Sequence, residues 1–408
     1  SDDNYHIPRY NVSIIGEENR TIILGEKLVI TQLGITLAGL RFTSRSSSQP
    51  FVIEIVEADA VIEHCIIDGR ISISNCSGGI PVIRENEILG NFRVNESDAS
   101  VNHVLDDALT VSASTVHIEG NHIHHNSTNG IGVYSKSGGF IGSNILSNHL
   151  KGQGIALFIC EDANFVLKSN TIHGNFNAIY VANSRVVISD NTIHSNRKGI
   201  VVNCSKVIIE NCSLYLHEQV AVYIGNMGSV KLNNNVMRSN SMSVCSCDSH
   251  VELKENTVLE NFEEFPAIGI SGSKSSFLMS KNEFCRNSGG VILTQDCSGL
   301  IDGNNFVQNS LYAIKANECQ SKIQHNTIQS QKNGSCIVLQ RAKPKSIITR
   351  NKIQYHLSVN HSAIAVTYHS TNVEITLNSV ENGMGSGVLV CYNSTITKFS
   401  DNGFVGNL

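Results

Sequence analysis

The strongest constraint in the sequence is an internal repeat of about 22 residues. Two consecutive segments, SNTIHGNFNAIYVANSRVVIS and DNTIHSNRKGIVVNCSKVIIE, run from Ser169 to Glu210 and share N-T-I-H-x-N followed by a small residue and I-x-V. The frame recurs along the chain, and its leading position falls at His64, Asn86, Asn121, Asn144, Asn170, Asn191, Cys212, Asn234, Asn256, Asn282, Asn304, Asn326, Asn351, Asn378 and Asn402. One step, from Asn86 to Asn121, is 35 residues long and indicates an insertion.

Each repeat holds three short apolar runs in which apolar residues alternate with other residues, as in strands. Three strands per repeat predict one coil of a β-solenoid, whose strands pair in parallel from coil to coil. We therefore expect an all-β, single-stranded right-handed parallel β-helix of about 15 coils, because parallel crossovers are right-handed. We expect one domain over 1–408, with an N-terminal cap and irregular first coils at 1–60, regular coils at 61–408, and an insertion near 91–110.

The recurrent Asn residues have a physical explanation. The chain must turn sharply between strands, and Asn tolerates left-handed backbone and bonds to local backbone groups. Asn side chains at equivalent positions of successive coils can also bond to one another. A second polar column lies five residues after the first, for example at Asn126, Asn175 and Asn196.

Composition limits the possible functions. The net charge of -5 gives no basic face for nucleic acid, and no apolar run is long enough for a membrane-spanning helix. The twelve cysteines are spread about one per repeat without a C-x-x-C pair, which favours unpaired core residues in the cytoplasm or another reducing compartment. A secreted protein is the alternative, and ten N-x-[ST] sequons would suit it. The chain starts without Met and stops inside a repeat, so we expect an excised fragment.

The frame N-x-I-H-x-N…G-I-x-V resembles the parallel β-helix repeats shared by carbohydrate-binding proteins and sugar hydrolases. Similar repeats occur in F-box proteins with β-helical substrate-binding domains and in Shc-binding spindle and cytokinesis proteins. The opening ITLAGLRF…AVIEHCIIDG is similar to the start of such domains. The resemblance covers nearly the whole chain and implies the fold, whereas function has to come from a site.

The catalytic motifs of β-helix enzymes are largely missing. Of the polygalacturonase-like motifs only Asp106-Asp107 matches, and the D-P-H motif of alginate epimerases is absent. Asp106, Asp107 and His103 in the insertion are the catalytic candidates if the protein is an enzyme, because a glycosidase needs two nearby carboxylates. A solvated acidic turn is the simpler interpretation, and we lean towards a protein that is not an enzyme.

Several histidines lie at positions that could suit metal ligands. His124, His173 and His194 share one column of the repeat, and stacked imidazoles can bind a metal. We favour the simpler interpretation that His belongs to the N-x-I-H turn, because no metal-binding motif supports the alternative. No metal site and no cofactor are therefore expected.

The outward-facing position of the I-x-V strand is unusually apolar. This column contains Gly132, Ala156, Tyr180, Val201, Tyr223, Cys245, Gly269, Ile292, Lys315, Val338, Ala365 and Leu389. A continuous apolar face indicates a binding surface, with Tyr180, Val201, Tyr223 and Ile292 as its candidate residues. Ordinary β-propensity in half-exposed strands is the alternative explanation.

These observations predict a non-catalytic intracellular β-helix that serves as a protein-recognition or scaffold domain of a larger protein, with a protein as its partner. The alternative is a carbohydrate-binding or polysaccharide-degrading protein, and a structural rod is a further possibility. A groove lined with acids and aromatic residues would favour the carbohydrate alternative.

Overall fold

The computed structural model describes residues 4–6, 11–17, 21–44, 50–89, 107–126, 128–149, 154–261 and 265–407. Within these ranges every regular element is a β-strand, and the strands form a right-handed parallel β-solenoid of about 16 turns. The fold predicted from the repeat is thereby confirmed. No helix in the described ranges has the length and apolar character that a membrane span requires.

The chain divides into two compact units. The first comprises 1–201 with 205–207, and the second comprises 202–204 with 208–408. The division falls at β24 (Lys198–Asn203) and β25 (Lys206–Glu210). The expectation of a single domain over 1–408 stays a prediction.

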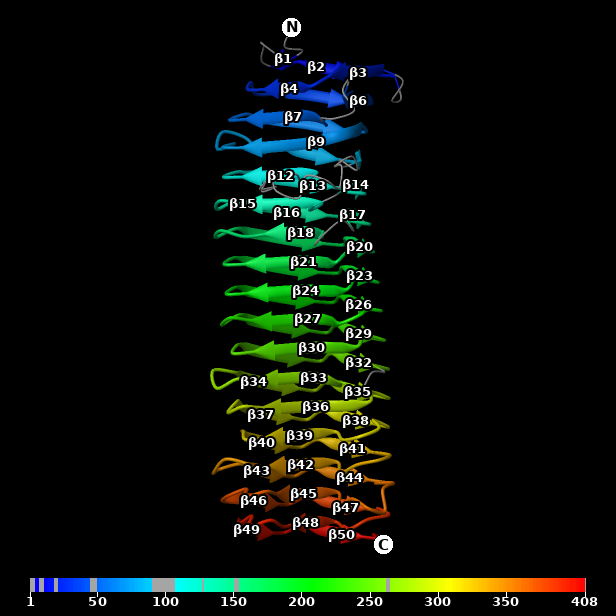
Figure 1. Cartoon of the computed structure of the whole chain (residues 1–408), viewed down its shortest axis with the longest axis vertical. Coiled ribbons are helices and arrows are strands. Elements are labelled where there is room, and N and C mark those ends of the chain that lie inside the picture. Colours follow the sequence, from blue (N-terminus) through cyan, green and yellow to red (C-terminus); the bar gives the residue numbers. More distant parts are fainter. Residues whose placement is uncertain are drawn as a thin grey trace, which may run out of the picture. The chain divides into compact units, whose positions relative to one another are not determined.

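Within each unit the strands build three parallel sheets, here called A, B and C (Figure 1). In the first unit, sheet A contains β1 (Asn4–His6), β4 (Lys27–Ile30), β7 (Phe51–Val56), the second part of β9 (Ile66–Ser74), β12 (Leu109–Ser112), β15 (Ile131–Tyr134), β18 (Ile155–Ile159) and β21 (Asn177–Ala182). Sheet B contains β2 (Ser13–Ile15), β5 (Ile35–Ala38), β8 (Ala60–Glu63), β10 (Val82–Arg84), β13 (Thr115–Glu119), β16 (Gly138–Gly142), β19 (Asn164–Lys168) and β22 (Arg185–Ser189). Sheet C contains β3 (Thr21–Gly25), β6 (Leu40–Ser44), the first part of β9, β11 (Glu87–Leu89), β14 (His122–His124), β17 (Ile145–Ser147), β20 (Thr171–His173) and β23 (Thr192–His194).

The second unit repeats this arrangement. Its sheet A contains β27 (Val220–Gly225), β30 (Met242–Cys247), β33 (Pro266–Ser271), β36 (Gly289–Thr294), β39 (Ile314–Asn317), β42 (Ile337–Gln340), β45 (Ile364–Thr367) and β48 (Val388–Val390). Sheet B contains β28 (Ser229–Asn233), β31 (His250–Lys254), β34 (Ser276–Ser280), β37 (Ser298–Asp302), β40 (Gln320–Gln324), β43 (Ile347–Thr349), β46 (Val373–Thr376) and β49 (Ile396–Ser400). Sheet C contains β26 (Ser213–Tyr215), β29 (Val236–Arg238), β32 (Thr257–Leu259), β35 (Glu283–Cys285), β38 (Asn305–Val307), β41 (Thr327–Gln329), β44 (Lys352–Gln354), β47 (Ser379–Glu381) and β50 (Gly403–Val405).

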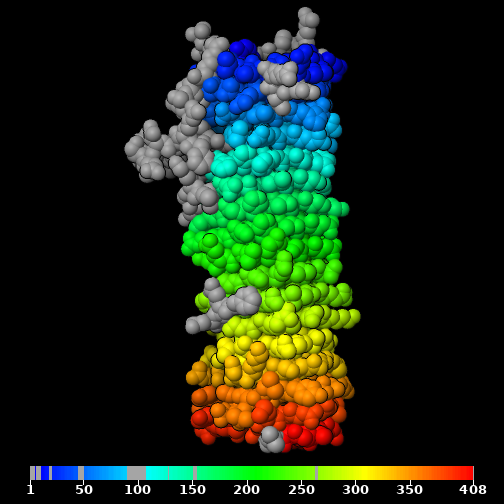
Figure 2. Space-filling model, turned by 90° about the vertical axis from the view of Figure 1, so that its right-hand side faces the viewer, coloured from blue at the N-terminus to red at the C-terminus, as the bar shows by residue number. Residues whose placement is uncertain are grey.

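The apolar alternation of each strand fills the core. In β7 and β9 every second residue is buried, and Phe51, Ile53 and Ile55 have no exposed surface. Where coils pair in parallel without a shift, as β35 and β38 do, an inward residue packs on its equivalent one coil away, and the ring centroids of Phe284 and Phe306 are 4.6 Å apart. Side chains of successive coils form closely stacked layers within each unit (Figure 2).

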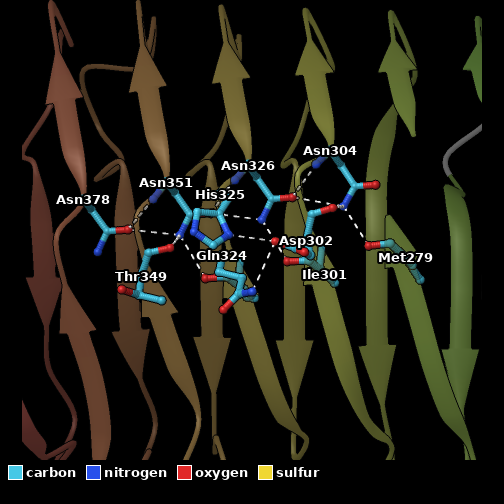
Figure 3. A network of polar contacts seen from close by, with 11 residues as sticks. Met279, Ile301, Asp302, Asn304, Gln324, His325, Asn326, Thr349, Asn351 and Asn378 are labelled. Carbon is cyan, nitrogen blue, oxygen red and sulfur yellow. Dashed lines mark hydrogen bonds and ion pairs between the residues drawn. The ribbon is translucent and has the colours of Figure 1, made fainter. Parts of the chain in front are cut away.

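A ladder of buried Asn side chains follows the turn from sheet B to sheet C. The backbone N–H and the Nδ2 of Asn304 both donate to Oδ1 of Asn326, at 2.9 and 3.0 Å, and the Nδ2 also donates to the carbonyl oxygen of Met279 at 3.0 Å (Figure 3). The same pattern joins Asn326 to Asn351 and Asn351 to Asn378. The amide therefore finds partners on both sides although it is buried, as a polar group in a core requires.

Two ladder positions differ from the sequence prediction by one residue. The ladder residues are Cys65 and Asn235, whereas His64 and Asn234 come one position earlier. His64 and Asn234 have left-handed backbone with φ of 53°, so they make the turn. In other coils, too, the residue with left-handed backbone comes directly before the ladder Asn, for example Asp190 or Lys281. The ladder Asn is therefore required for the hydrogen bonds of its side-chain amide and not for a left-handed turn conformation.

The second polar column lies between sheets C and A and contains several residues other than Asn, among them His149. Nδ1 of buried His149 accepts from the backbone N–H and the Nδ2 of Asn126, at 3.2 and 3.1 Å, while the N–H of His149 donates to Oδ1 of Asn175. Among the described residues, no group forms a well-oriented hydrogen bond with Nε2 of His149. Burial, with a smaller contribution from the charges of His124 and His125, lowers the pKa of His149 to about 3.

We predict that Asn304→Ala lowers the free energy of unfolding by roughly 3 kcal/mol, because it leaves buried donors of Asn282 and the carbonyl of Met279 without partners. Urea unfolding followed by circular dichroism measures the effect. The control is Asn305→Ala, which removes a half-exposed side chain at the start of β38 and should cost less than about 0.5 kcal/mol. Equal losses for the two variants would contradict the structural role of the ladder.

We predict that His149→Asn flattens the dependence of stability on acidic pH. The folded pKa of His149 lies below its unfolded value of 6.5, so the unfolded chain binds the proton first and stability falls as the pH drops from about 6.5 towards 3. Asn removes this titration and matches the neighbouring Asn126 and Asn175. Unfolding midpoints at several pH values should therefore fall less steeply in the variant than in the wild type, and parallel curves would argue against the assignment.

Candidate functional site

The catalytic candidates from the insertion are only partly described. His103 and Asp106 lie outside the described residues. Asp107 is buried at the edge of sheet A and accepts a hydrogen bond from the hydroxyl of Tyr134 at 2.8 Å. Gly132 makes room for this carboxylate, since a Cβ there would lie 1.8 Å from Oδ2 of Asp107. A catalytic role of these residues stays a prediction.

Burial, reinforced by the negative charge of Asp107, raises the pKa of Tyr134 well above its usual range. The phenol therefore stays protonated and keeps donating to the carboxylate. The contact anchors Asp107 against sheet A, and it gives the carboxylate the hydrogen bond that a buried charge needs.

Tyr134 begins a row of aromatic rings on the outward face of sheet A in the first unit. Its ring centroid lies 5.7 Å from that of Phe158, which in turn lies 5.5 Å from that of Tyr180. Phe158 and not Ala156 occupies the outward position, because Phe158 pairs with Gly132 and with Tyr180 while Ala156 is fully buried. The irregular pairing at the start of β18 shifts its alternation.

The four predicted binding residues belong to different units. Tyr180 and Val201 lie in the first unit, and Tyr223 and Ile292 in the second. Val201 is only 5% exposed, although its position in the repeat is outward. Tyr180, Tyr223 and Ile292 are half-buried. A binding role for these residues stays a prediction.

A cluster of imidazoles lies on sheet C of the first unit. Parallel pairing of β11 with β14 puts Glu87 opposite His122, and His124 follows two residues later on the same side of β14. Ligand atoms of Glu87, His122 and His124 all lie within 4.8 Å of one another, and we call these three residues the histidine cluster. The ring centroids of His122 and His124 are 4.1 Å apart.

The environment of His124 differs from that of its neighbours. It is 8% exposed, its Nε2 lies 3.4 Å from Oε1 of Glu87, and its Nδ1 lies 2.5 Å from Nδ1 of His125. Burial and the nearby His122 lower the pKa of His124, and Glu87 opposes this. At neutral pH the imidazole is thus favoured in its neutral form, which offers a lone pair.

The sequence suggested another histidine arrangement, and part of it is present. His173 and His194 stack with parallel rings, 5.1 Å between centroids, in adjacent coils. His124 shares their column but is separated from His173 by Ser147. The sequence analysis did not identify Glu87 as a neighbour of these histidines. Glu87 pairs with His122 across the long insertion, and this pairing depends on the same strand register before and after the insertion.

A groove of about 600 Å³ lies on the outward face of sheet A in the second unit. Val338, Ala365 and Leu389 line it from successive strands β42, β45 and β48, and Lys315 contributes from β39. Aromatic and polar side chains complete the lining, namely Tyr312, Asn333, Gln340, Asn360, His361, Ser362, Tyr368 and Tyr392.

Three tyrosines supply the aromatic surface of this groove. The rings of Tyr368 and Tyr392 stack at 4.6 Å between centroids with an interplanar angle of 5°, and both are exposed. Tyr312 is half-buried, and burial raises the pKa of its phenol. Asp and Glu do not occur among the described residues that line the groove. Four residues of the predicted outward column, Lys315, Val338, Ala365 and Leu389, thus line one concave surface.

The cysteines are all present as thiols in the structure. Seven of them are buried, namely Cys65, Cys76, Cys160, Cys212, Cys297, Cys319 and Cys336. Burial raises the pKa of Cys336 and of Cys65, the latter to about 11, which suppresses the reactive thiolate. Burial in the core can protect a thiol from oxidation, so the presence of thiols does not identify a reducing compartment.

Comparison with known families agrees with the fold. A family model described as the right-handed β-helix region matches residues 138–277. The predicted resemblance to right-handed parallel β-helix repeats is thereby confirmed. A second model, described as the periplasmic copper-binding protein NosD, matches residues 209–384 of this β-helix protein. In the described part of that span, no three His, Cys, Asp or Glu side chains come together as they do in the histidine cluster.

No curated protein matches the sequence. Among solved structures, the periplasmic alginate epimerase AlgG is similar over 93% of this chain and 78% of its own, with 9% identity and a TM-score of 0.38. The Vag8–C1 inhibitor complex is similar over 98% and 100%, with 9% identity and a TM-score of 0.42. The GH87 α-1,3-glucanase of Streptomyces thermodiastaticus is similar over 95% and 62%, with 12% identity and a TM-score of 0.27. These similarities concern the fold and carry no functional argument.

Two expectations are corrected by the family match. The intracellular protein-recognition or scaffold function is wrong, because the matching NosD family is described as periplasmic and copper-binding. The cytoplasmic location is wrong for the same reason. Both expectations depended on the unpaired cysteines and on the apolar outward face, and the structure explains these by core burial and by stacking of outward side chains between coils.

We predict that Tyr134→Phe destabilises the protein by about 2 kcal/mol, because a buried carboxylate loses a hydrogen bond from a neutral donor. Denaturant unfolding measures the loss. Tyr368→Phe serves as control, since its exposed hydroxyl should contribute little. If the two substitutions changed the unfolding midpoint equally, the contact between Tyr134 and Asp107 would not stabilise the fold.

Proposed function

We propose that this protein is an exported carbohydrate-binding β-helix that holds an acidic polysaccharide in the groove of the second unit. The observation that carries the proposal is the concave surface of about 600 Å³ with tyrosine rings and amides around an apolar floor. Its volume is within the range of ligand sites, roughly 300 to 1,000 Å³.

The chemistry of the lining suits a sugar. A sugar ring has an apolar C–H face and a rim of hydroxyls. The rings of Tyr368 and Tyr392 supply apolar surface with a polar tip, while Asn333, Asn360 and Gln340 supply amides that donate and accept hydrogen bonds. A groove that crosses successive coils of one sheet also suits an extended chain.

The charges of the lining favour an acidic sugar and binding without cleavage. Lys315 and His361 are its ionisable nitrogen groups, and the described lining contains no carboxylate. A uronate carboxylate would therefore meet a cation and no like charge. Glycoside hydrolysis requires two carboxylates near the scissile bond, so this groove lacks the machinery for that reaction.

The match to the NosD model supports the proposed location. NosD is described as periplasmic, and its model matches residues 209–384, which include most of the groove residues. We therefore place this protein outside the cytoplasm, where polysaccharides are met.

We predict that the wild-type protein binds polyuronate oligosaccharides in isothermal titration calorimetry and that Tyr368→Ala with Tyr392→Ala weakens binding about tenfold or more, because stacked aromatic contacts contribute about 1.5 kcal/mol. Lys315→Gln should reduce affinity for polyuronate but not for neutral glucan oligosaccharides.

The matched control is Tyr355→Ala, which removes an exposed tyrosine that does not line the groove. It should bind like the wild type. Absence of binding to both sugars, or the same loss in Tyr355→Ala as in the groove variant, would contradict the proposal.

A further inference from the structure

The histidine cluster of the first unit is separate from the groove and calls for its own explanation. It combines two imidazoles and one carboxylate from strands β11 and β14. The family match to NosD covers residues 209–384 and does not reach these residues. The following inference therefore does not depend on the proposed carbohydrate function.

We infer that Glu87, His122 and His124 bind a divalent first-row transition-metal ion. Imidazole nitrogen and carboxylate oxygen together suit ions such as Zn²⁺ and Cu²⁺, whereas Mg²⁺ and Ca²⁺ prefer oxygen ligands alone. Three protein ligands leave at least one coordination position open for water or another small ligand. This departs from the sequence expectation of no metal site.

The spacing of the donor atoms fits such an ion. Nε2 of His124 and Oε1 of Glu87 are 3.4 Å apart, which is long for a hydrogen bond. It equals the separation of about 3.4 Å between two ligands on a tetrahedral ion with bonds of about 2.1 Å. His122 is exposed and Glu87 is half-exposed, so both side chains can close the remaining distance.

The backbone and the neighbouring side chains fix the cluster. Glu87 and His122 are register partners in adjacent coils, so the spacing of parallel strands sets their separation. His124 is held more tightly, because it is buried and its Nδ1 contacts Nδ1 of His125. A metal-binding His commonly uses its second ring nitrogen in this way, which fixes the orientation of the first.

An ion also resolves the electrostatics of the cluster. The ring centroids of His122 and His124 are 4.1 Å apart, and those of His124 and His125 are 4.8 Å apart. A cation between the ligand atoms of Glu87, His122 and His124 would give the carboxylate an opposite charge and each imidazole an acceptor for its lone pair.

Zinc binding to the full chain tests the inference. The protein is stripped with a chelator, kept reduced with a phosphine so that thiols do not oxidise, and titrated with Zn²⁺ in a calorimeter. We expect His122→Ala with His124→Ala to bind one equivalent less than the wild type. Glu87→Gln should bind this equivalent at least about tenfold more weakly, as loss of a ligand or its support does elsewhere.

Controls separate the cluster from other zinc ligands. His194→Ala removes a half-exposed imidazole that lies in the same column as His124 but three coils further along, and it should keep the full stoichiometry. Co²⁺ replaces Zn²⁺ as a spectroscopic probe, and the equivalent lost in the double variant should lack the thiolate charge-transfer band that cysteine ligands produce. Circular dichroism and the unfolding midpoint of each variant, measured without metal, establish that the fold is retained.

Three results would overturn the inference. One is equal zinc stoichiometry in the wild type and in the folded double variant. Another is a thiolate band for the equivalent that the double variant loses, which would assign that ion to cysteines. Loss of one equivalent in His194→Ala as well would likewise exclude a site confined to the histidine cluster.

Discussion

The bifurcated hydrogen bond at each ladder Asn is the interaction on which the rest of the structure depends. One Oδ1 accepts from both the backbone and the side-chain amide of the preceding coil, and one Nδ2 donates to a core carbonyl. The turn between sheets B and C thereby stays buried without unsatisfied polar groups. Because coils with a ladder Asn are held at the same point of their circuit, the strands that follow start in register, and most outward side chains form straight columns.

The sequence predicted this architecture well because its signal is periodic. Asn170 and Asn191 stand at equivalent positions of two nearly identical repeats, and the structure joins them at 2.9 and 3.0 Å. Where Asn residues follow one another, as at 233–235, composition alone could not distinguish the left-handed turn residue from the ladder residue. The turn residue and the ladder residue differ in their hydrogen bonds to the next coil, and the sequence of a single repeat does not show these bonds.

The candidate sites were harder to predict, since they depend on which residues of different coils become neighbours. Glu87 and His122 are 35 positions apart and meet only because the insertion leaves the register unchanged. The groove residues Val338, Ala365 and Leu389 were identified as outward, but the tyrosines beside them lie outside the repeated frame. The spacing of the cysteines predicted a reducing compartment. That prediction was wrong, because burial in the core can also protect a thiol from oxidation.

The pairing of Glu87 with His122 across the insertion has a wider consequence. Hydrogen bonds between ladder residues align successive coils, whatever the number of residues between the ladder positions. A loop between two ladder positions can therefore change its length without moving the strands that follow. Each turn is thus a place where sequence can be added at little cost to the fold. Surface sites of such a protein can change by exchange of single outward residues or of whole loops, while the stacked core beneath them remains the same.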